Sequence, residues 1–254
     1  MKSTIASNIK QAILSRGFFI GVIGIVLVVF LSSTESIIGA FRADALQANG
    51  FHATLVLSAL SAEGMTLALP ILCALPYTAS FVDDIKSGFI KQYLHRTTVK
   101  DYIFGKLAAC ALSGGLTLVV GILLAYGISA LAFTPMEAAL AEGEMAQPYF
   151  AELLTRSLLF FCSGAFWSVL GMTFATLTNS KYMAYASPFI LYYVLIILNE
   201  RYFDALYVLY PKEWLNPSDF WVMGIFGVIL LLLELSFIVS LAFGFAAGRR
   251  IRQI

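Results

Sequence analysis

The chain has 254 residues, of which 60% are hydrophobic and only 12% are charged. Soluble domains carry about 25% charged residues, so most of this protein's surface does not face water. The formal net charge of +1 says nothing about partners by itself, and we expect no nucleic-acid partner.

Six apolar stretches are long enough to cross a bilayer, because a helical span needs about 20 mostly apolar residues. Their apolar residues are continuous rather than alternating, and open sheets cannot cross lipid. The sequence therefore predicts an all-α integral membrane protein that forms a single domain over residues 1–254. The predicted spans are 18–38, 55–80, 102–133, 154–177, 183–198 and 220–246.

Residues 1–16 precede the first span, and Ile5, Ile9 and Ile13 follow helical spacing on one face. This pattern predicts an amphipathic elbow helix in the inner membrane interface, with a solvated tail as the alternative. The first span is interpreted as a retained helix rather than a signal peptide, because residues 31–35 offer no small-x-small cleavage site.

The next connections also carry local signals. Pro70 and Pro76 predict a kink or local unwinding in the second span, which neighbouring helices must satisfy. Thr98 and Asp101 form a capping pattern at the start of the third span, which is long enough to tilt or to project beyond the lipid. Residues 199–219 mix aromatic and charged side chains, which predicts short interfacial helices on the outer face.

The distribution of basic residues predicts the topology, because loops rich in Lys and Arg stay in the cytoplasm. If the N-terminus is inside, twelve of the 16 Lys and Arg residues are cytoplasmic, and the acidic residues 137–152 form a solvated outer loop. Both termini are therefore predicted to be cytoplasmic, in a multi-pass protein of a bacterial cytoplasmic membrane. The twelve residues are Lys2, Lys10, Arg16, Lys86, Lys91, Arg96, Lys100, Lys106, Lys181, Arg249, Arg250 and Arg252.

The sequence shows no machinery for catalysis. It lacks a Gly-Lys-Ser or Gly-Lys-Thr phosphate loop, and it lacks the His-Glu-x-x-His and Gly-x-Ser-x-Gly motifs. His52 and His95 lie in loops that are predicted on opposite sides of the membrane. Cys73, Cys110 and Cys162 lie singly in apolar runs without metal or disulfide spacing. We therefore expect no enzymatic activity, metal or cofactor in this chain itself.

Two carboxylates lie within predicted spans. Glu234 falls near the bilayer midplane, where an ionised group is costly unless it is paired, so we expect it to face the protein interior. There it would contact a substrate or gating partner or, as a neutral acid, hydrogen-bond a neighbouring helix. Glu63 lies closer to the outer interface, where solvation favours a structural role.

The best functional candidate is the charged island at residues 81–106. Asp83 and Asp84 precede the run 85–94 and can both cap a helix and oppose its dipole. Phe89 and Ile90 begin an apolar edge on that helix. A short helix of this kind can seat in a groove of a soluble protein, and a plain cytoplasmic loop is the alternative.

The spacing of six residues in this island resembles the cytoplasmic loop of the type-2 ATP-binding-cassette exporter permeases: Asp84, Gly88, Lys91, Arg96, Tyr102 and Lys106. The six spans, the cytoplasmic termini, the elbow and the outer helices are similar too, so the resemblance covers essentially the full length. The longer acidic outer loop departs from the family pattern, and Glu234 matches no family role.

The resemblance implies that residues 84–94 form a coupling helix, within a coupling loop at 81–101, that fits into a separate nucleotide-binding subunit. That subunit would bind ATP and Mg²⁺, and the permease would work as a dimer with a second permease chain. Gly88 would permit close approach, while Arg96 and Lys106 would anchor the loop to headgroups or to the partner. The implied coupling residues are Asp83, Asp84, Gly88, Phe89, Lys91, Arg96 and Lys106.

The expected function is therefore that of the membrane-spanning permease subunit of an ATP-driven exporter. It would move an amphipathic or hydrophobic cargo, such as an antimicrobial peptide or a drug, by alternating access. Three alternatives stay open: a lipid or glycolipid exporter, a proton-coupled secondary transporter that uses Glu234, and a structural or sensory membrane subunit without transport.

Overall fold

The computed structural model describes residues 2–43, 45–93, 97–139, 147–203, 206–221 and 223–253. Within these ranges the regular elements are helices, and Gln47 and Glu137 form an isolated β-bridge. In chain order the elements are α1 (Lys2–Ile13), α2 (Arg16–Ser32), α3 (Thr34–Arg42), α4 (Phe51–Leu60), α5 (Glu63–Leu72), α6 (Ser80–Lys86), α7 (Phe89–Tyr93), α8 (Val99–Phe133), the 3-10 helix η1 (Thr134–Met136), α9 (Tyr149–Thr178), α10 (Lys181–Tyr202), the 3-10 helix η2 (Tyr207–Leu209) and α11 (Ile225–Ile251).

The described residues contain four helices that are long and apolar enough to cross a membrane: α8 with η1, α9, α10 and α11. Two bent pairs, α1 with α2 and α4 with α5, would raise this number to six if each pair is one span. The predicted all-α fold is confirmed, and these apolar helices suit a multi-pass membrane protein.

The first two predicted spans are not continuous helices. The span 18–38 is divided at Ser33, whose hydroxyl donates to the Leu55 carbonyl at 3.2 Å, and α3 begins at the next residue. The span 55–80 is broken between α4 and α5, which meet at an angle of 67°. The predicted unwinding at the prolines is confirmed, because α5 ends at Leu72 and residues 73–79 form turns.

Neighbouring elements hold the unwound segment 73–79 in place. The Ser15 hydroxyl donates to the Pro76 carbonyl at 3.1 Å, and the Ser168 hydroxyl donates to the Cys73 carbonyl at 2.7 Å. Gly17 lets α2 pass close by, since an added Cβ would lie 2.2 Å from the Leu75 carbonyl oxygen. These contacts supply the donors that backbone without helical pairing needs inside a membrane.

Helix α8 is the centre of the bundle and packs against α9, α2, α1 and α4. Its predicted cap is confirmed, because the Thr98 hydroxyl accepts from the Asp101 amide at 3.2 Å. At about 1.5 Å per residue, its 35 residues reach about 50 Å, which exceeds the hydrocarbon core of about 30 Å. A tight turn joins the next two helices, α9 and α10, with Asn179 in the left-handed conformation at φ 53°.

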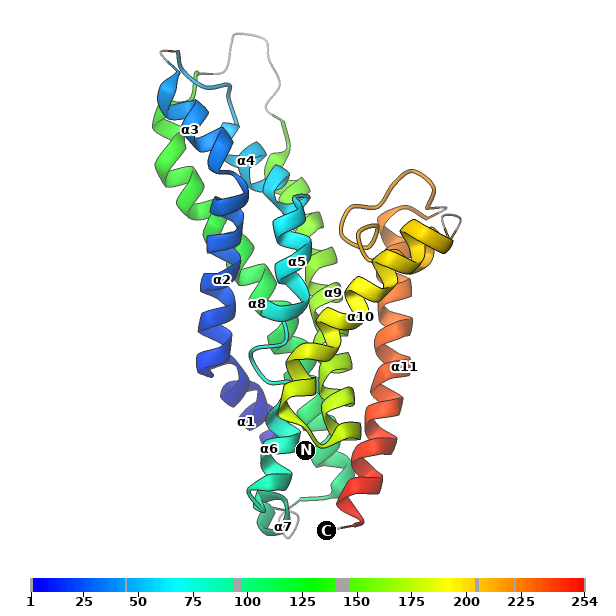
Figure 1. The fold of residues 1–254 in the computed structure, drawn as a ribbon. Helices are drawn as coiled ribbons and strands as arrows, with labels where there is room; N and C mark the ends of the chain where they lie inside the picture. The colour runs from blue at the N-terminus through cyan, green and yellow to red at the C-terminus, as the bar shows by residue number, and fades with distance from the viewer. Residues whose placement is uncertain are drawn as a thin grey trace.

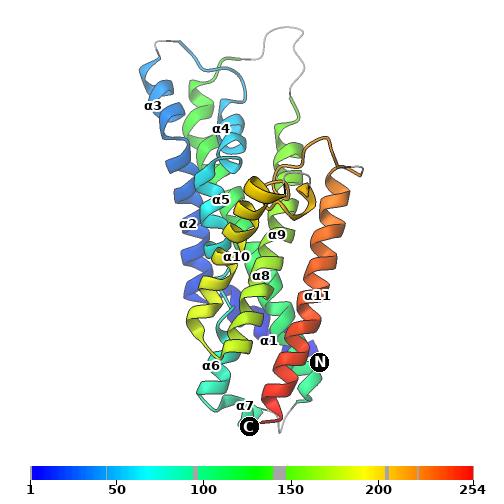
Figure 2. The same ribbon diagram turned by 45° about the vertical axis from the view of Figure 1, so that its right-hand side comes forward.

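Both ends of the chain lie at the same end of the bundle as α6 and α7, whereas α3 and the connection from α10 to α11 lie at the other (Figure 1, Figure 2). We call these the α7 end and the α3 end. Each has its own buried cluster. The one at the α7 end joins α1, α6, α7, α8, α9 and α11 through side chains such as Ala12, Phe81, Ile90, Tyr102 and Phe243.

In the described part of the segment 199–219, where short interfacial helices were predicted, one short 3-10 helix is present. Helix α10 continues to Tyr202, and the rest contains only η2 and turns. Side chains compete there for the backbone groups that a helix would pair. The Trp214 indole donates to the Val208 carbonyl at 2.9 Å, and the Glu213 carboxylate accepts from the Ser218 amide at 2.8 Å.

Candidate functional site

The charged island folds into two short helices rather than one. Helices α6 and α7 are separated at Ser87 and Gly88, which divides the predicted coupling helix 84–94. Gly88 has φ +72°, a conformation that favours glycine. An added Cβ there would meet nothing within 4 Å, so in this chain the turn explains the glycine. We call the segment 80–93 the α6–α7 hairpin.

Lys106 was expected to reach headgroups or the partner subunit, but it lies two turns inside α8 and is 2% exposed. Its Nζ atom is 2.7 Å from Oδ2 of Asp84 on α6. The Tyr102 hydroxyl, one turn earlier on α8, donates to the same Asp84 oxygen at 2.6 Å. A buried ammonium needs a paired carboxylate to offset its lost hydration, which explains why Lys106 turns inward.

The same lysine connects the hairpin to α1. Lys106 Nζ donates to the Tyr77 hydroxyl at 3.1 Å and lies 4.7 Å from the centre of the Tyr77 ring. The Tyr77 hydroxyl donates to Asn8 Oδ1 at 2.9 Å, and Gln11 Oε1 lies 3.1 Å away. We call Asn8, Gln11, Tyr77, Asp84, Tyr102 and Lys106 the Lys106 network.

The Lys106 network can act as a rigid connection rather than as a catalyst. It joins α1, the segment 73–79, α6 and α8 through side chains that are mostly buried, and hydrogen-bonded networks of this kind fix geometry. The Nδ2 atom of Asn8 is the exception, since it is buried without a hydrogen-bond partner. Two open grooves flank it, with volumes of about 230 and 210 Å³. Asp84 and Gln11 line both grooves.

The remaining predicted coupling residues lie on the outer side of the hairpin. Asp83 forms an ion pair with Lys181 at the start of α10, and both side chains are about half exposed. Phe89 is 46% exposed and Lys91 is exposed. Arg96 lies outside the described residues. The hairpin thus turns Asp84 toward α8 and presents Phe89 and Lys91 to the surroundings.

The two intramembrane carboxylates are both exposed in this chain. Glu63 lies in the first turn of α5, where a negative charge is favourable to the helix dipole. Glu234 does not face the interior of this bundle as expected. Helix α11 packs through Val228, Leu232 and Phe243 instead, and Glu234 lies on its other face.

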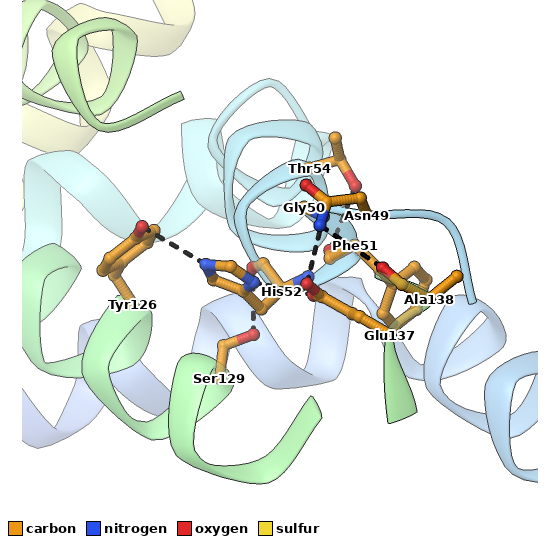
Figure 3. Close-up of polar contacts among 9 residues, drawn as sticks. All are labelled: Asn49, Gly50, Phe51, His52, Thr54, Tyr126, Ser129, Glu137 and Ala138. Atoms are coloured by element: carbon orange, nitrogen blue, oxygen red, sulfur yellow. Dashed lines mark hydrogen bonds and ion pairs between the residues drawn. The ribbon is translucent and has the colours of Figure 1, made fainter. Parts of the chain in front are cut away.

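A second polar cluster lies at the α3 end and was not predicted from the sequence (Figure 3). Glu137 follows η1, and its carboxylate accepts hydrogen bonds from the His52 amide at 2.7 Å and from the Gly50 amide at 3.0 Å. It therefore caps the N-terminus of α4 from a distant part of the chain. The prediction that residues 137–152 form a solvated acidic loop is wrong at Glu137, because its side chain is only 5% exposed.

The His52 ring extends this cluster to α8. Its Nδ1 atom is 2.7 Å from Glu137 Oε1, and its Nε2 atom is 3.3 Å from the Tyr126 hydroxyl. Because a carboxylate can only accept hydrogen bonds, Nδ1 carries the ring proton and donates a hydrogen bond to Glu137. The Ser129 hydroxyl donates to the His52 carbonyl at 3.0 Å. We call Gly50, His52, Tyr126, Ser129 and Glu137 the Glu137 cluster.

The pKa of Glu137 reflects two opposing effects. Desolvation raises the pKa of this carboxyl, whereas hydrogen bonds from the His52 amide, the His52 ring and the Gly50 amide lower it. The hydrogen bonds prevail, so the pKa lies below its ordinary value. The carboxylate is therefore held in its charged form as the acceptor for α4.

No protein-family model, curated protein or solved structure matches this chain. In the described residues there is also no group of three or more His, Cys, Asp or Glu side chains that could hold a metal ion.

Proposed function

We propose that this chain is the membrane-spanning permease subunit of an ATP-driven exporter of the type-2 ATP-binding-cassette kind. It has no ATPase activity of its own in this proposal. A separate cytoplasmic subunit binds ATP and Mg²⁺, and a second permease chain completes the transport unit. The protein resides in a bacterial cytoplasmic membrane and crosses it six times, with α1 as an interfacial elbow among the lipid headgroups.

The observation that carries this proposal is the fixed connection between the α6–α7 hairpin and the bundle. A partner that moves the hairpin can move α8 only if the joint between them is stiff. Asp84 is bound at its carboxylate by both Lys106 and Tyr102 of α8, while Ile90 of α7 is 1% exposed. Force on Phe89 and Lys91 would therefore reach the long central helix.

The arrangement of the chain ends supports a cytoplasmic position for the α6–α7 hairpin. The hairpin lies at the α7 end together with α1 and the C-terminal end of α11 (Figure 1), which carries Arg249 and Arg250 in its last turn. Loops and ends rich in Lys and Arg stay in the cytoplasm. A soluble ATPase could then reach the hairpin.

The cargo in this proposal is an amphipathic or hydrophobic molecule, such as a peptide or a drug, that leaves the cell by alternating access of the bundle. Lipids and glycolipids belong to the same physical class. A proton-coupled transporter that uses Glu234 has less support, because this residue lies on the outward face of α11 and lines none of the grooves at the α7 end.

Co-purification tests the proposal directly. The chain is purified from its native membrane under mild conditions, and P-loop ATPases that accompany it are identified by mass spectrometry. We expect one such ATPase with the wild-type chain and about tenfold less of it with the double variant Phe89→Ala, Lys91→Glu, because groove contacts of this kind depend on a few anchors.

Lys10→Glu is the matched control, because Lys10 is an exposed lysine on α1 and lies outside the hairpin. It should leave the recovery of the ATPase unchanged. The proposal fails if no P-loop ATPase accompanies the wild-type chain, or if the double variant and the control retain it equally.

A further inference from the structure

The carboxyl group of Glu234 lies where lipid cannot solvate it. The residue is nine positions after Ile225 and fifteen before Arg249, which correspond to about 14 and 22 Å along the helix. A hydrocarbon core of about 30 Å therefore contains Glu234. The residue is exposed in this chain and forms no hydrogen bond or ion pair with any residue that the structure describes. Intramembrane carboxylates normally pair or face protein, so another protein group is needed here.

Glu234 is at the centre of an apolar face that this chain leaves uncovered. Helix α11 forms the edge of the bundle in both views (Figure 1, Figure 2). Within its 18-residue apolar stretch, 11% of the residues are buried, compared with 78% in the corresponding stretch of α9. The exposed side chains recur every three or four positions on one helical face: Leu230, Glu234, Ile238, Leu241 and Phe245.

The same helix has a place where a second helix can approach closely. Gly244 and Gly248 are four residues apart, and a Cβ added to either would meet nothing within 4 Å. Both glycines line a groove of about 460 Å³, whose other lining residues lie at the C-terminal end of α11 and just after it. Two small residues at this spacing allow membrane helices to pack backbone to backbone.

We propose that α11 pairs with α11 of a second copy of this chain, with closest approach at Gly244 and Gly248. Copies that insert by the same charge rule are parallel, and a two-fold contact brings identical residues together at equal depth. The two Glu234 side chains then meet and, when protonated, each donates its O–H to the carbonyl oxygen of the other. A lipid tail provides no such partner, and a foreign helix would need a donor at the same depth.

This inference deepens the proposed function, on which it rests for the presence of a second permease chain, by naming the helix at which the two chains meet. Its test is independent of transport, because it measures association of the purified chain alone in liposomes. An absent ATPase would therefore overturn the proposed function without affecting this result.

Disulfide cross-linking locates the contact. Leu241→Cys places a thiol on the exposed face of α11, and Leu27→Cys is the control, because Leu27 is 56% exposed on α2. After oxidation in liposomes we expect about tenfold more covalent dimer for Leu241→Cys than for Leu27→Cys, as close helix packing requires. Equal cross-linking of the two variants, or more dimer through Leu27, would overturn the proposal.

Dilution of labelled chains in liposomes measures the strength of association by energy transfer. Gly248→Leu and Glu234→Leu should each weaken it by about threefold to tenfold, while Glu234→Gln retains it because paired amides also donate and accept. Gly127→Leu is the matched control, since an added Cβ on this exposed glycine of α8 also meets nothing within 4 Å. The proposal is wrong if the wild-type chain is monomeric, or if Gly248→Leu and Glu234→Leu associate like the wild type.

Discussion

The two ends of the bundle use a carboxylate in different ways. At the α7 end, Asp84 is bound by two side chains of one helix, Lys106 and Tyr102. At the α3 end, Glu137 is bound mainly by the backbone amides at the start of α4. The first arrangement pairs two charges, so loss of either leaves the other buried. The second caps a helix, so we expect its loss to destabilise mainly the N-terminal turn of α4.

The largest expected effect comes from breaking the charge pair. Lys106→Met should destabilise the folded state by about 3–5 kcal/mol, because it leaves Asp84 without its buried partner. The double variant Lys106→Met, Asp84→Leu should recover part of this loss, since no unpaired charge then remains. Thermal unfolding of the purified protein in detergent measures both changes.

Lys100→Met is the control for this comparison, because Lys100 is an exposed lysine on the same helix. Its effect should stay within about 0.5 kcal/mol. If Lys106→Met is no more destabilising than Lys100→Met, the Lys106 network does not hold the hairpin to α8.

A smaller and more local effect is expected at the α3 end. Glu137→Ala should cost about 1–3 kcal/mol, because it leaves the partly buried Gly50 and His52 amides without their acceptor. Hydrogen exchange of the amides in α4 should become faster, while exchange in α6 stays unchanged. Glu152→Ala is the control, since Glu152 is 52% exposed. Uniform acceleration at both ends would show that the two clusters are not independent.

The smallest effect is a dependence on acid at the α3 end. The folded-state pKa of Glu137 lies below its ordinary value of 4.5, so its contribution is present above that pH and is lost as the pH falls through the lowered pKa. Exchange of the α4 amides, corrected for intrinsic rates, should therefore accelerate in the wild type as the pH falls below 4.5. Glu137→Gln should remove this dependence, and an unchanged profile would contradict the role of the carboxylate.

The long helices could be predicted from the sequence because each is a continuous apolar run. The predicted spans 102–133 and 154–177 lie within α8 and α9. The break at Ser33 and the break between α4 and α5 could not be located, because neither follows a proline or glycine. Serine does not stop a helix by itself, and the breaks depend on contacts such as that of Ser33 with Leu55.

The two polar clusters differ in how far they could be predicted. His52 and Glu137 are 85 residues apart, so no local pattern connects them. The inward position of Lys106 had a signal, since the Thr98 cap already placed it well inside a helix and on one face with Tyr102. Treating every lysine of the island as exposed obscured that signal.

The unwound segment 73–79 has a mechanical consequence. Single serine hydroxyls from α9 and from the corner between α1 and α2 hold its carbonyls at Cys73 and Pro76, so the chain has a hinge between the half of the molecule that includes α5 and the half that carries the hairpin. Such a hinge is stiff only while these two bonds and the contacts of Tyr77 with Asn8 and Lys106 are formed. Loss of the Ser15 and Ser168 hydrogen bonds together would loosen this segment. Motion of the hairpin would then be transmitted less well to α5.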